Sequence, residues 1–248
     1  MFEDSIKNGV GIVLTTIKGR EDLFEITLKS IVENAGRPFR LVVVCNEDQK
    51  AIKLALKNKN LCEAILFKTN DNGFSYSLNM GLNYFKTISE FYKVNEPDII
   101  GYSCDDLFYG EGWLTKTLNM WEDIDYKCLK VGIISPHNSS KMEEQIKIER
   151  DMGDYYLTNY ASGTVYLFKR TWLAKLRPNG LLMTERHIGQ EDWDLLLKNK
   201  SLGYKCAMLK ENVVKHLGQV SSWGNDGNIK HLDVTDEELK ELKKEYGS

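Results

Sequence analysis

The chain has 248 residues, of which 42% are hydrophobic and 28% charged, and these proportions are typical of a soluble globular protein. A chain of this length can bury one large core, as single α/β domains commonly do. Its Lys+Arg total of 33 nearly balances its Asp+Glu total of 36, so the formal net charge of −3 disfavours a nucleic-acid partner held by an overall basic field.

Hydropathy and cysteine usage predict a cytoplasmic protein. The sequence has no apolar run of about eighteen residues, which a membrane span needs, and its first residues lack the apolar core of a signal peptide. Its five cysteines are an odd number without CxxC spacing. This pattern favours a reducing compartment and argues against a zinc site or a disulfide framework.

Strand-like and helix-like patterns alternate along the first part of the chain. The apolar runs expected to form strands are Gly11–Thr16, Leu41–Cys45, Ala64–Lys68 and Ile99–Tyr102. The helical patterns between them are Glu21–Ala35, Gln49–Lys57 and Ser75–Tyr92. Successive β–loop–α units predict parallel strands joined by right-handed crossovers. The sequence contains neither GxGxxG nor GxxxxGK[ST], which disfavours a Rossmann dinucleotide site and a P-loop.

The second half of the chain is less regular. The expected strands and helices are Trp113–Ile124, Val131–Ser135, Thr164–Lys169, Trp172–Leu176 and Trp193–Asn199. Thr235 and Glu238 form a capping box that opens a terminal polar helix. The segments expected to be exposed or irregular are the charge-dense Lys141–Asp154, the loop Arg177–Gln190 and the mobile segment Gln219–His231.

Two adjacent carboxylates, Asp105 and Asp106, follow the expected strand Ile99–Tyr102. Ligands bind at the carboxyl ends of the strands in open α/β sheets. Neighbouring acids repel each other, so a cation is expected to compensate them. Mg²⁺ sites commonly combine one or two carboxylates with substrate phosphates. The alternative is a solvated turn, because Asp is common in turns.

A second acidic cluster, Glu191, Asp192 and Asp194, lies at the start of an expected helix. The helix macrodipole favours negative charge there, which accounts for at least Glu191 and Asp194 without a function. Alternatively, one of these carboxylates is a general base for an alcohol acceptor. His216 is either a structural histidine or, where Asp106 holds a divalent ion, part of the shell of that ion.

In their order along the chain, these residues resemble the motifs of a family 2 glycosyltransferase, in the nucleotide-diphospho-sugar transferase superfamily with the GT-A fold. The matching motifs are Ile12–Thr16 with Arg20, Leu28-x-Ser30-Ile31, Leu41–Asn46, Asn72–Gly81, Asp105-Asp106, Ser162-Gly163, Glu191–Asp194, Leu202–Tyr204 and Val213–His216. The resemblance implies an α/β, Rossmann-like, mixed and mostly parallel central sheet flanked by helices. It also implies one glycosyltransferase domain over 1–232, followed by a polar helix or tail at 233–248.

The resemblance further implies a nucleotide site. Asn46 stands where the family usually has an Asp that contacts a uracil ring, and a UDP-sugar is the expected donor. Asp105 is expected near the ribose or just behind the metal ligands. The other residues expected to contact the nucleotide are Thr15, Thr16, Arg20, Gly73, Ser77 and Asn79.

The remaining roles that the resemblance implies concern the metal and the reaction. Asp106 and His216 match the ligands of a Mn²⁺ or Mg²⁺ ion. Asp192 resembles the catalytic base of the inverting enzymes, with Glu191 as the neighbouring catalytic candidate. Trp193 is a weaker candidate for contact with a sugar. Apart from the resemblance, His187, Trp223 and His137 are weak candidates for contact with the donor or acceptor because of their positions in loops.

The expected activity is a metal-dependent, hexosyltransferase-like transfer to an acceptor hydroxyl, with inversion by single displacement. Two alternatives stay open: a sugar-1-phosphate nucleotidyltransferase and a non-catalytic sugar- or nucleotide-binding module. The single glycine in Thr15–Arg20 disfavours the first, and the intact acids disfavour the second. The acceptor is a glycan, a protein or a small hydroxyl compound. A hydroxylated DNA base is a minority possibility, because phosphate contacts dominate DNA affinity and this chain is acidic.

Overall fold

The computed structural model describes residues 9–16, 19–45, 49–68, 73–137, 147–161, 163–176, 191–218 and 233–247. The strands in these ranges are β1 (Val10–Thr15), β2 (Arg40–Cys45), β3 (Ala64–Phe67), β4 (Ile99–Ser103), β5 (Leu107–Tyr109), β6 (Val131–Ser135), β7 (Ile148–Asp151), β8 (Tyr155–Thr158), β9 (Val165–Lys169), β10 (Lys205–Leu209) and β11 (Val214–His216). The helices are α1 (Glu21–Glu33), α2 (Gln49–Lys57), the 3₁₀ turn η1 (Lys59–Leu61), α3 (Gly73–Tyr92), α4 (Trp113–Tyr126), α5 (Arg170–Leu176), α6 (Glu191–Ser201) and α7 (Asp236–Tyr246).

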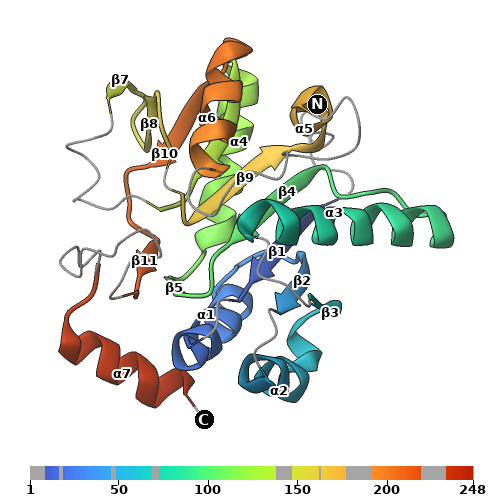
Figure 1. The fold of residues 1–248 in the computed structure, drawn as a ribbon. Helices are drawn as coiled ribbons and strands as arrows, with labels where there is room; N and C mark the ends of the chain where they lie inside the picture. The colour runs from blue at the N-terminus through green and yellow to red at the C-terminus, as the bar shows by residue number, and fades with distance from the viewer. Residues whose placement is uncertain are drawn as a thin grey trace.

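Nine of the described strands form one sheet in the order β3-β2-β1-β4-β9-β6-β10-β8-β7 (Figure 1). The pairs β1–β2, β2–β3 and β1–β4 are parallel, as the alternating pattern of the first part of the chain predicts. Strand β9 runs antiparallel to β4 and β6, and β8 runs antiparallel to β7 and β10. The other strands of the sheet share one direction, so the sheet is mixed and mostly parallel.

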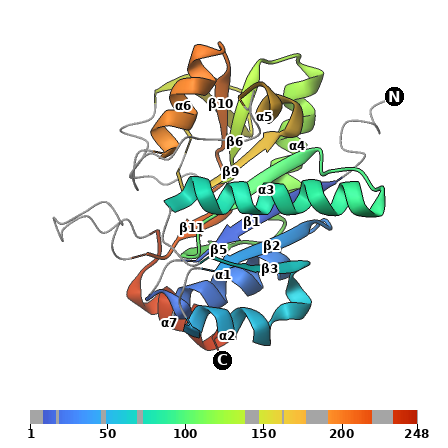
Figure 2. The same ribbon diagram turned by 45° about the vertical axis from the view of Figure 1, so that its right-hand side comes forward.

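Helices cover both faces of this sheet because successive side chains of a strand point to opposite faces. On β1, Ile12 and Leu14 pack into the apolar cluster of α1, α2 and α4. The residue between them, Val13, packs into the cluster of α3, α5 and α6. Helix α3 crosses in front of the strands in Figure 2. The expected fold class, an α/β sheet flanked by helices in a single domain, is therefore confirmed.

Helix α3 packs closely on β1 through a glycine. A Cβ atom built at Gly81 would overlap the side chain of Val13. Only a residue without a side chain brings the helix backbone this close to the strand. The contact fixes the level at which the first turns of α3, with Ser77 and Asn79, meet the carboxyl end of β1.

Several short strands differ from the expectations. The segment Lys141–Asp154, expected to be an exposed excursion, contains strand β7 at the edge of the sheet, and the four residues of that strand are exposed. Strands β5 and β11 have three residues each, too few to show a periodicity. Helix α5 begins two residues before the expected start, at Arg170, whereas α6 begins at Glu191, where the acidic cluster predicts a helix start. The segments Arg177–Gln190 and Gln219–His231 lie outside the described residues.

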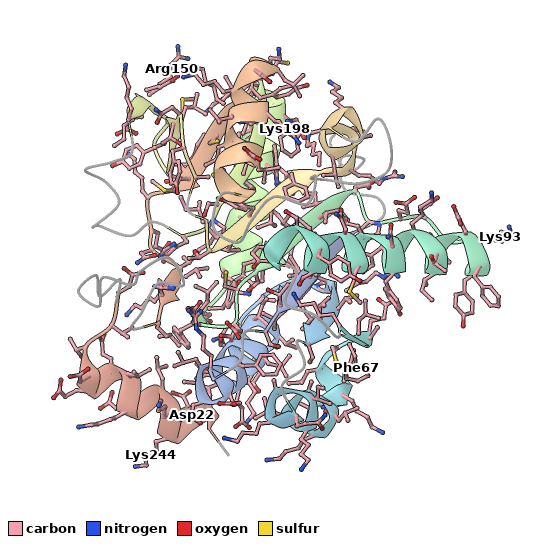
Figure 3. The ribbon with its side chains drawn as sticks, viewed as in Figure 1. Asp22, Phe67, Lys93, Arg150, Lys198 and Lys244 are labelled. Carbon is pink, nitrogen blue, oxygen red and sulfur yellow. The ribbon has the colours of Figure 1, made fainter. Side chains whose placement is uncertain are left out.

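The terminal helix α7 begins at the predicted capping box. The Thr235 hydroxyl accepts a hydrogen bond from the Glu238 N–H at 3.2 Å, and the Glu238 carboxylate accepts one from the Thr235 N–H at 2.7 Å. Helix α7 lies beside α1, where Lys243 Nζ is 3.2 Å from the carboxylate of Asp22, the residue labelled on α1 in Figure 3. No helix in the described part of the chain is long and apolar enough to cross a membrane.

Candidate active site

The acid pair Asp105–Asp106 lies where the chain leaves the main sheet. Strand β4 ends at Ser103, and β5 begins at Leu107 and pairs antiparallel with β11. In this register Leu107 lies opposite His216, which brings the imidazole next to Asp106. The Leu217 N–H also donates to the backbone oxygen of Asp106 at 2.8 Å. Two short strands therefore bring together residues that are more than a hundred positions apart.

Helix α1 holds β5 in place through two buried hydroxyl groups. The Leu107 N–H donates to Thr27 Oγ1 at 3.0 Å, and the Tyr109 N–H donates to Ser30 Oγ at 3.2 Å. The Thr27 hydroxyl also donates to the Leu107 carbonyl oxygen at 2.7 Å. Since a three-residue strand satisfies few backbone groups through its partner, these hydroxyl groups satisfy the remainder.

The acid pair is buried and has a basic neighbour. Asp105 and Asp106 are 0% and 1% exposed. The guanidinium of Arg20 donates to Asp106 Oδ2, and its Nη1 lies 3.6 Å from Asp105 Oδ1. The Nε2 atom of His216 lies 3.1 Å from the same Oδ2 atom. Arg20 thus provides positive charge beside the two acids, a contact that the sequence pattern does not indicate.

These contacts keep Asp106 and Arg20 ionised. Burial by itself would raise the pKa of Asp106, but the hydrogen bond from His216 and the charges of His216 and Arg20 outweigh it and lower that pKa. Burial likewise would lower the pKa of Arg20, but Asp106 and Asp105 outweigh it and raise that pKa. A fixed carboxylate and a fixed guanidinium therefore face each other at this edge of the sheet.

One oxygen of Asp106 is left for a ligand. Asp106 Oδ1 is buried and has no hydrogen-bond partner among the described residues. The described ranges gather no group of three or more His, Cys, Asp or Glu side chains around one point. A carboxylate with an oxygen that lacks a described partner, and a neighbouring imidazole, fit a Mg²⁺ or Mn²⁺ ion, because such ions commonly complete their shell with water and substrate phosphates.

Three polar side chains, of Thr15, Tyr102 and Cys104, form a hydrogen-bonded row beside the acid pair. The hydroxyl groups of Thr15 and Tyr102 lie 3.1 Å apart, and the Tyr102 hydroxyl lies 3.5 Å from Cys104 Sγ. Burial raises the pKa of Tyr102, and burial together with the nearby Asp106 charge raises the pKa of the Cys104 thiol. Both groups therefore stay protonated, and Cys104 is not a thiolate nucleophile.

The expected nucleotide residues that the structure describes lie toward one edge of the sheet. Thr15 and Thr16 lie at the carboxyl end of β1, and the Thr16 N–H donates to the Val44 carbonyl oxygen of β2 at 3.1 Å. Gly73 is the first residue of α3, and Ser77 and Asn79 are buried on its first turns. Asp105 and Asp106 follow β4 on the same side, because β1 and β4 are parallel.

Other expected site residues lie outside the described part of the chain. Asn46, His187 and Trp223 are among these. The backbone of the first turn of α6 is described and begins at Glu191, as expected for a helix start. The side chains of Glu191, Asp192 and Trp193 are outside the described residues, so their roles stay predictions.

Gly218 is required for the close approach of the segment after β11 to Asp106. A Cβ atom at this position would overlap Asp106 Oδ2 and lie 3.2 Å from His216 Cε1. We predict that Gly218→Ala displaces the Asp106 carboxylate and lowers turnover of a nucleotide-sugar by about 10–100-fold. Lys53→Ala, at an exposed position on α2, is the control, and steady-state kinetics of both variants is the measurement. Equal rates for the two variants would contradict the prediction.

Comparison with known proteins shows the fold. No family model and no curated protein matches the sequence. Among solved structures, the mannosyltransferase PcManGT from Pyrobaculum calidifontis, in complex with GDP-Man and Mn²⁺, matches with a TM-score of 0.58 and 16% identity over 82% of this chain and 55% of that chain. TarS of S. aureus (1–349) matches with a TM-score of 0.55 and 15% identity over 83% of this chain and 59% of that chain.

The two matches agree in what they cover. In each case most of this chain aligns with little more than half of the other chain. At such low identity the likeness concerns the arrangement of the backbone rather than the identity of the site residues. The chain therefore has a GT-A-like α/β fold, shared with a mannosyltransferase whose structure contains a nucleotide-sugar and a divalent metal ion.

Proposed function

We propose that this chain is an inverting, metal-dependent glycosyltransferase that moves a sugar from a nucleotide-diphosphate donor to an acceptor hydroxyl. The observation that carries the proposal is the environment of Asp106. One oxygen of this buried carboxylate is held by Arg20 and His216, and the other has no partner among the described residues. The fold shared with a mannosyltransferase bound to GDP-Man and Mn²⁺ supports it.

Asp106 and His216 are the proposed ligands of a Mn²⁺ or Mg²⁺ ion. When bound, such an ion offsets the negative charge that develops on the leaving diphosphate. The Arg20 guanidinium lies against Asp106 Oδ2, the oxygen that His216 also contacts, and contributes a second positive charge at this edge. A donor diphosphate at this edge would meet both the bound ion and the Arg20 guanidinium.

Asp192 is the proposed general base. In a single displacement, its carboxylate takes the proton of the acceptor hydroxyl while the acceptor oxygen bonds to the anomeric carbon. The bond from that carbon to the diphosphate oxygen breaks, and the nucleoside diphosphate leaves with the electron pair. Attack on the face opposite to the leaving group inverts the configuration. Glu191 is the neighbouring candidate for the same work.

The nucleotide is proposed to bind along the carboxyl ends of β1 to β4. The residues proposed to contact it are Thr15, Thr16, Arg20, Asn46, Gly73, Ser77, Asn79 and Asp105. A UDP-hexose is the proposed donor, and a glycan, a protein or a small hydroxyl compound the proposed acceptor. Trp193, His187 and Trp223 remain weaker candidates for sugar contact. We place the enzyme in the cytoplasm, with the transferase domain over 1–232 and the polar helix over 233–248.

A donor-hydrolysis screen tests the proposed function. The purified chain is incubated with UDP-, GDP- and dTDP-sugars in the presence of Mn²⁺, Mg²⁺ or EDTA, and the released nucleotide is identified by chromatography. We expect release of a nucleoside diphosphate with at least one donor, and loss of that release in EDTA. In a parallel incubation with nucleoside triphosphates and sugar 1-phosphates, release of pyrophosphate would instead identify a nucleotidyltransferase. Binding without turnover across the panel would identify a binding module.

A further inference from the structure

A series of hydrogen bonds between buried polar groups connects His216 to the start of the terminal helix. The carboxylate oxygen Asp233 Oδ2 accepts a hydrogen bond from the His216 backbone N–H at 2.8 Å and one from His137 Nε2 at 2.7 Å. On the other side of that ring, His137 Nδ1 lies 3.0 Å from Thr164 Oγ1. The Asp233 N–H also donates to the His216 carbonyl oxygen at 3.0 Å.

These hydrogen bonds connect four segments that are distant in sequence. His137 follows β6, Thr164 precedes β9, Asp233 precedes α7, and His216 ends β11. The side chains of His137 and Asp233 are 2% and 6% exposed, and the rings of His137 and His216 lie 6.4 Å apart. The backbone of His216 and Leu217 is therefore held from two sides, by Asp233 and by the Asp106 carbonyl oxygen.

The directions of these hydrogen bonds follow from the chemistry of the groups. A carboxylate oxygen only accepts, so the Nε2 atom of His137 carries a proton and donates it to Asp233. Two N–H donors on one carboxylate oxygen offset the cost of burying its charge. Apolar side chains would fill such a space at lower cost, since a buried charge stabilises a fold less than close packing does. A role in orienting His216 accounts for the presence of a buried charge at this place.

We infer that Asp233 is a positioning residue, which, together with His137, fixes the backbone of His216 so that its imidazole stays directed at Asp106. This inference rests on the proposed function, because it gives the terminal segment a part in holding the metal ligands. In metal sites, residues that hydrogen-bond to the metal ligands orient those ligands, and loss of such a residue typically lowers metal affinity about 10–100-fold. Helix α7, which packs on α1 through Leu239 and Tyr246, anchors Asp233.

The Asp233→Asn variant tests the inference, with Asp236→Asn, an exposed position on the first turn of α7, as the control. The chain has four histidines, so the imidazole resonances in NMR spectra can be assigned by single His→Gln substitutions. Without added metal, we expect Asp233→Asn to shift the signals of both His137 and His216. In titrations with Mn²⁺ alone, we expect its Kd to rise about tenfold. Asp236→Asn is expected to change neither quantity.

A second pair of variants separates positioning from folding. His137→Gln keeps an N–H donor near the position of Nε2, whereas His137→Leu removes it. We expect His137→Gln to retain most of the Mn²⁺ affinity and His137→Leu to lose about as much as Asp233→Asn, with Tm values of all variants within about 4 °C of the unmodified chain. Loss of Tm without any change in Mn²⁺ affinity or in the His216 signal would show a purely structural role and overturn the inference.

The two readouts also distinguish this inference from the proposed function. An unmodified chain that does not bind Mn²⁺ would overturn the metal-dependent function. The His216 signal in metal-free Asp233→Asn would still decide the positioning role. An unshifted His216 signal would overturn that role whether or not Mn²⁺ binds.

Discussion

Asp106→Asn is expected to lower nucleotide-sugar turnover by at least about 10³-fold, which is the largest effect that we predict for the acid pair. The substitution keeps the shape of the side chain but removes its charge and the carboxylate oxygen that faces no described partner. The remaining His216 imidazole is a single ligand, which does not hold Mg²⁺ or Mn²⁺ firmly. Isothermal titration with Mn²⁺ is therefore expected to show weaker binding, in parallel with the loss of turnover.

The fold should survive Asp106→Asn. The Leu217 N–H donates to the backbone oxygen of Asp106, which the substitution leaves in place. Arg20 keeps Asp105 as an acidic neighbour, with its Nη1 3.6 Å from that carboxylate. Asp151→Asn, an exposed acid on β7, is the matched control and should retain full activity. Comparable turnover by Asp106→Asn and Asp151→Asn, at equal Tm, would refute the role assigned to Asp106.

The first half of the fold is predictable from local pattern. The strands β1, β2, β3 and β4 are apolar runs, and the helices between them have clear amphipathic periods, so the parallel core follows from the sequence. The acid pair at the end of β4 is predictable for the same reason. Its position relative to the sheet depends only on where one apolar run ends.

The pairing that completes the site is not predictable in this way. Strands β5 and β11 have three residues each, and their pairing places His216 beside Asp106 through contacts between distant segments. Arg20 has a local position near the end of β1, but its contact with the acid pair depends on how α1 begins. Asp233 carries no periodic or motif signature at all. Such residues become recognisable only when the tertiary structure brings four segments together.

The edge strand β7 is not predictable from hydropathy either. Its residues are all exposed and mostly charged, so nothing in their hydropathy indicates a strand. Backbone hydrogen bonds to β8 hold it in the sheet. Charged residues on an edge strand also protect the sheet from pairing with other chains, which gives the composition of this segment a physical reason.

Asp192→Asn is the second substitution for which we expect a large effect, a loss of about 10²–10⁴-fold in transfer to the acceptor. An amide of the same shape does not take up the acceptor proton, so the attacking oxygen stays a weak nucleophile. Asp192 is the second residue of α6, a position where a carboxylate is also favoured by the helix dipole. The mutation therefore distinguishes a catalytic base from a residue that only stabilises the helix start.

The control for Asp192→Asn is Asp194→Asn in the same turn of α6. Both substitutions remove one negative charge from the helix start, so both are expected to change stability by a similar amount, below about 1 kcal/mol. Only the loss of a base would reduce transfer while nucleotide and Mn²⁺ binding, measured by titration, stay unchanged. If both variants lose activity equally, the charge of the helix start is what matters and Asp192 is not the base. If neither loses activity, another group takes the proton, and Glu191, the first residue of the helix, is the next to be substituted.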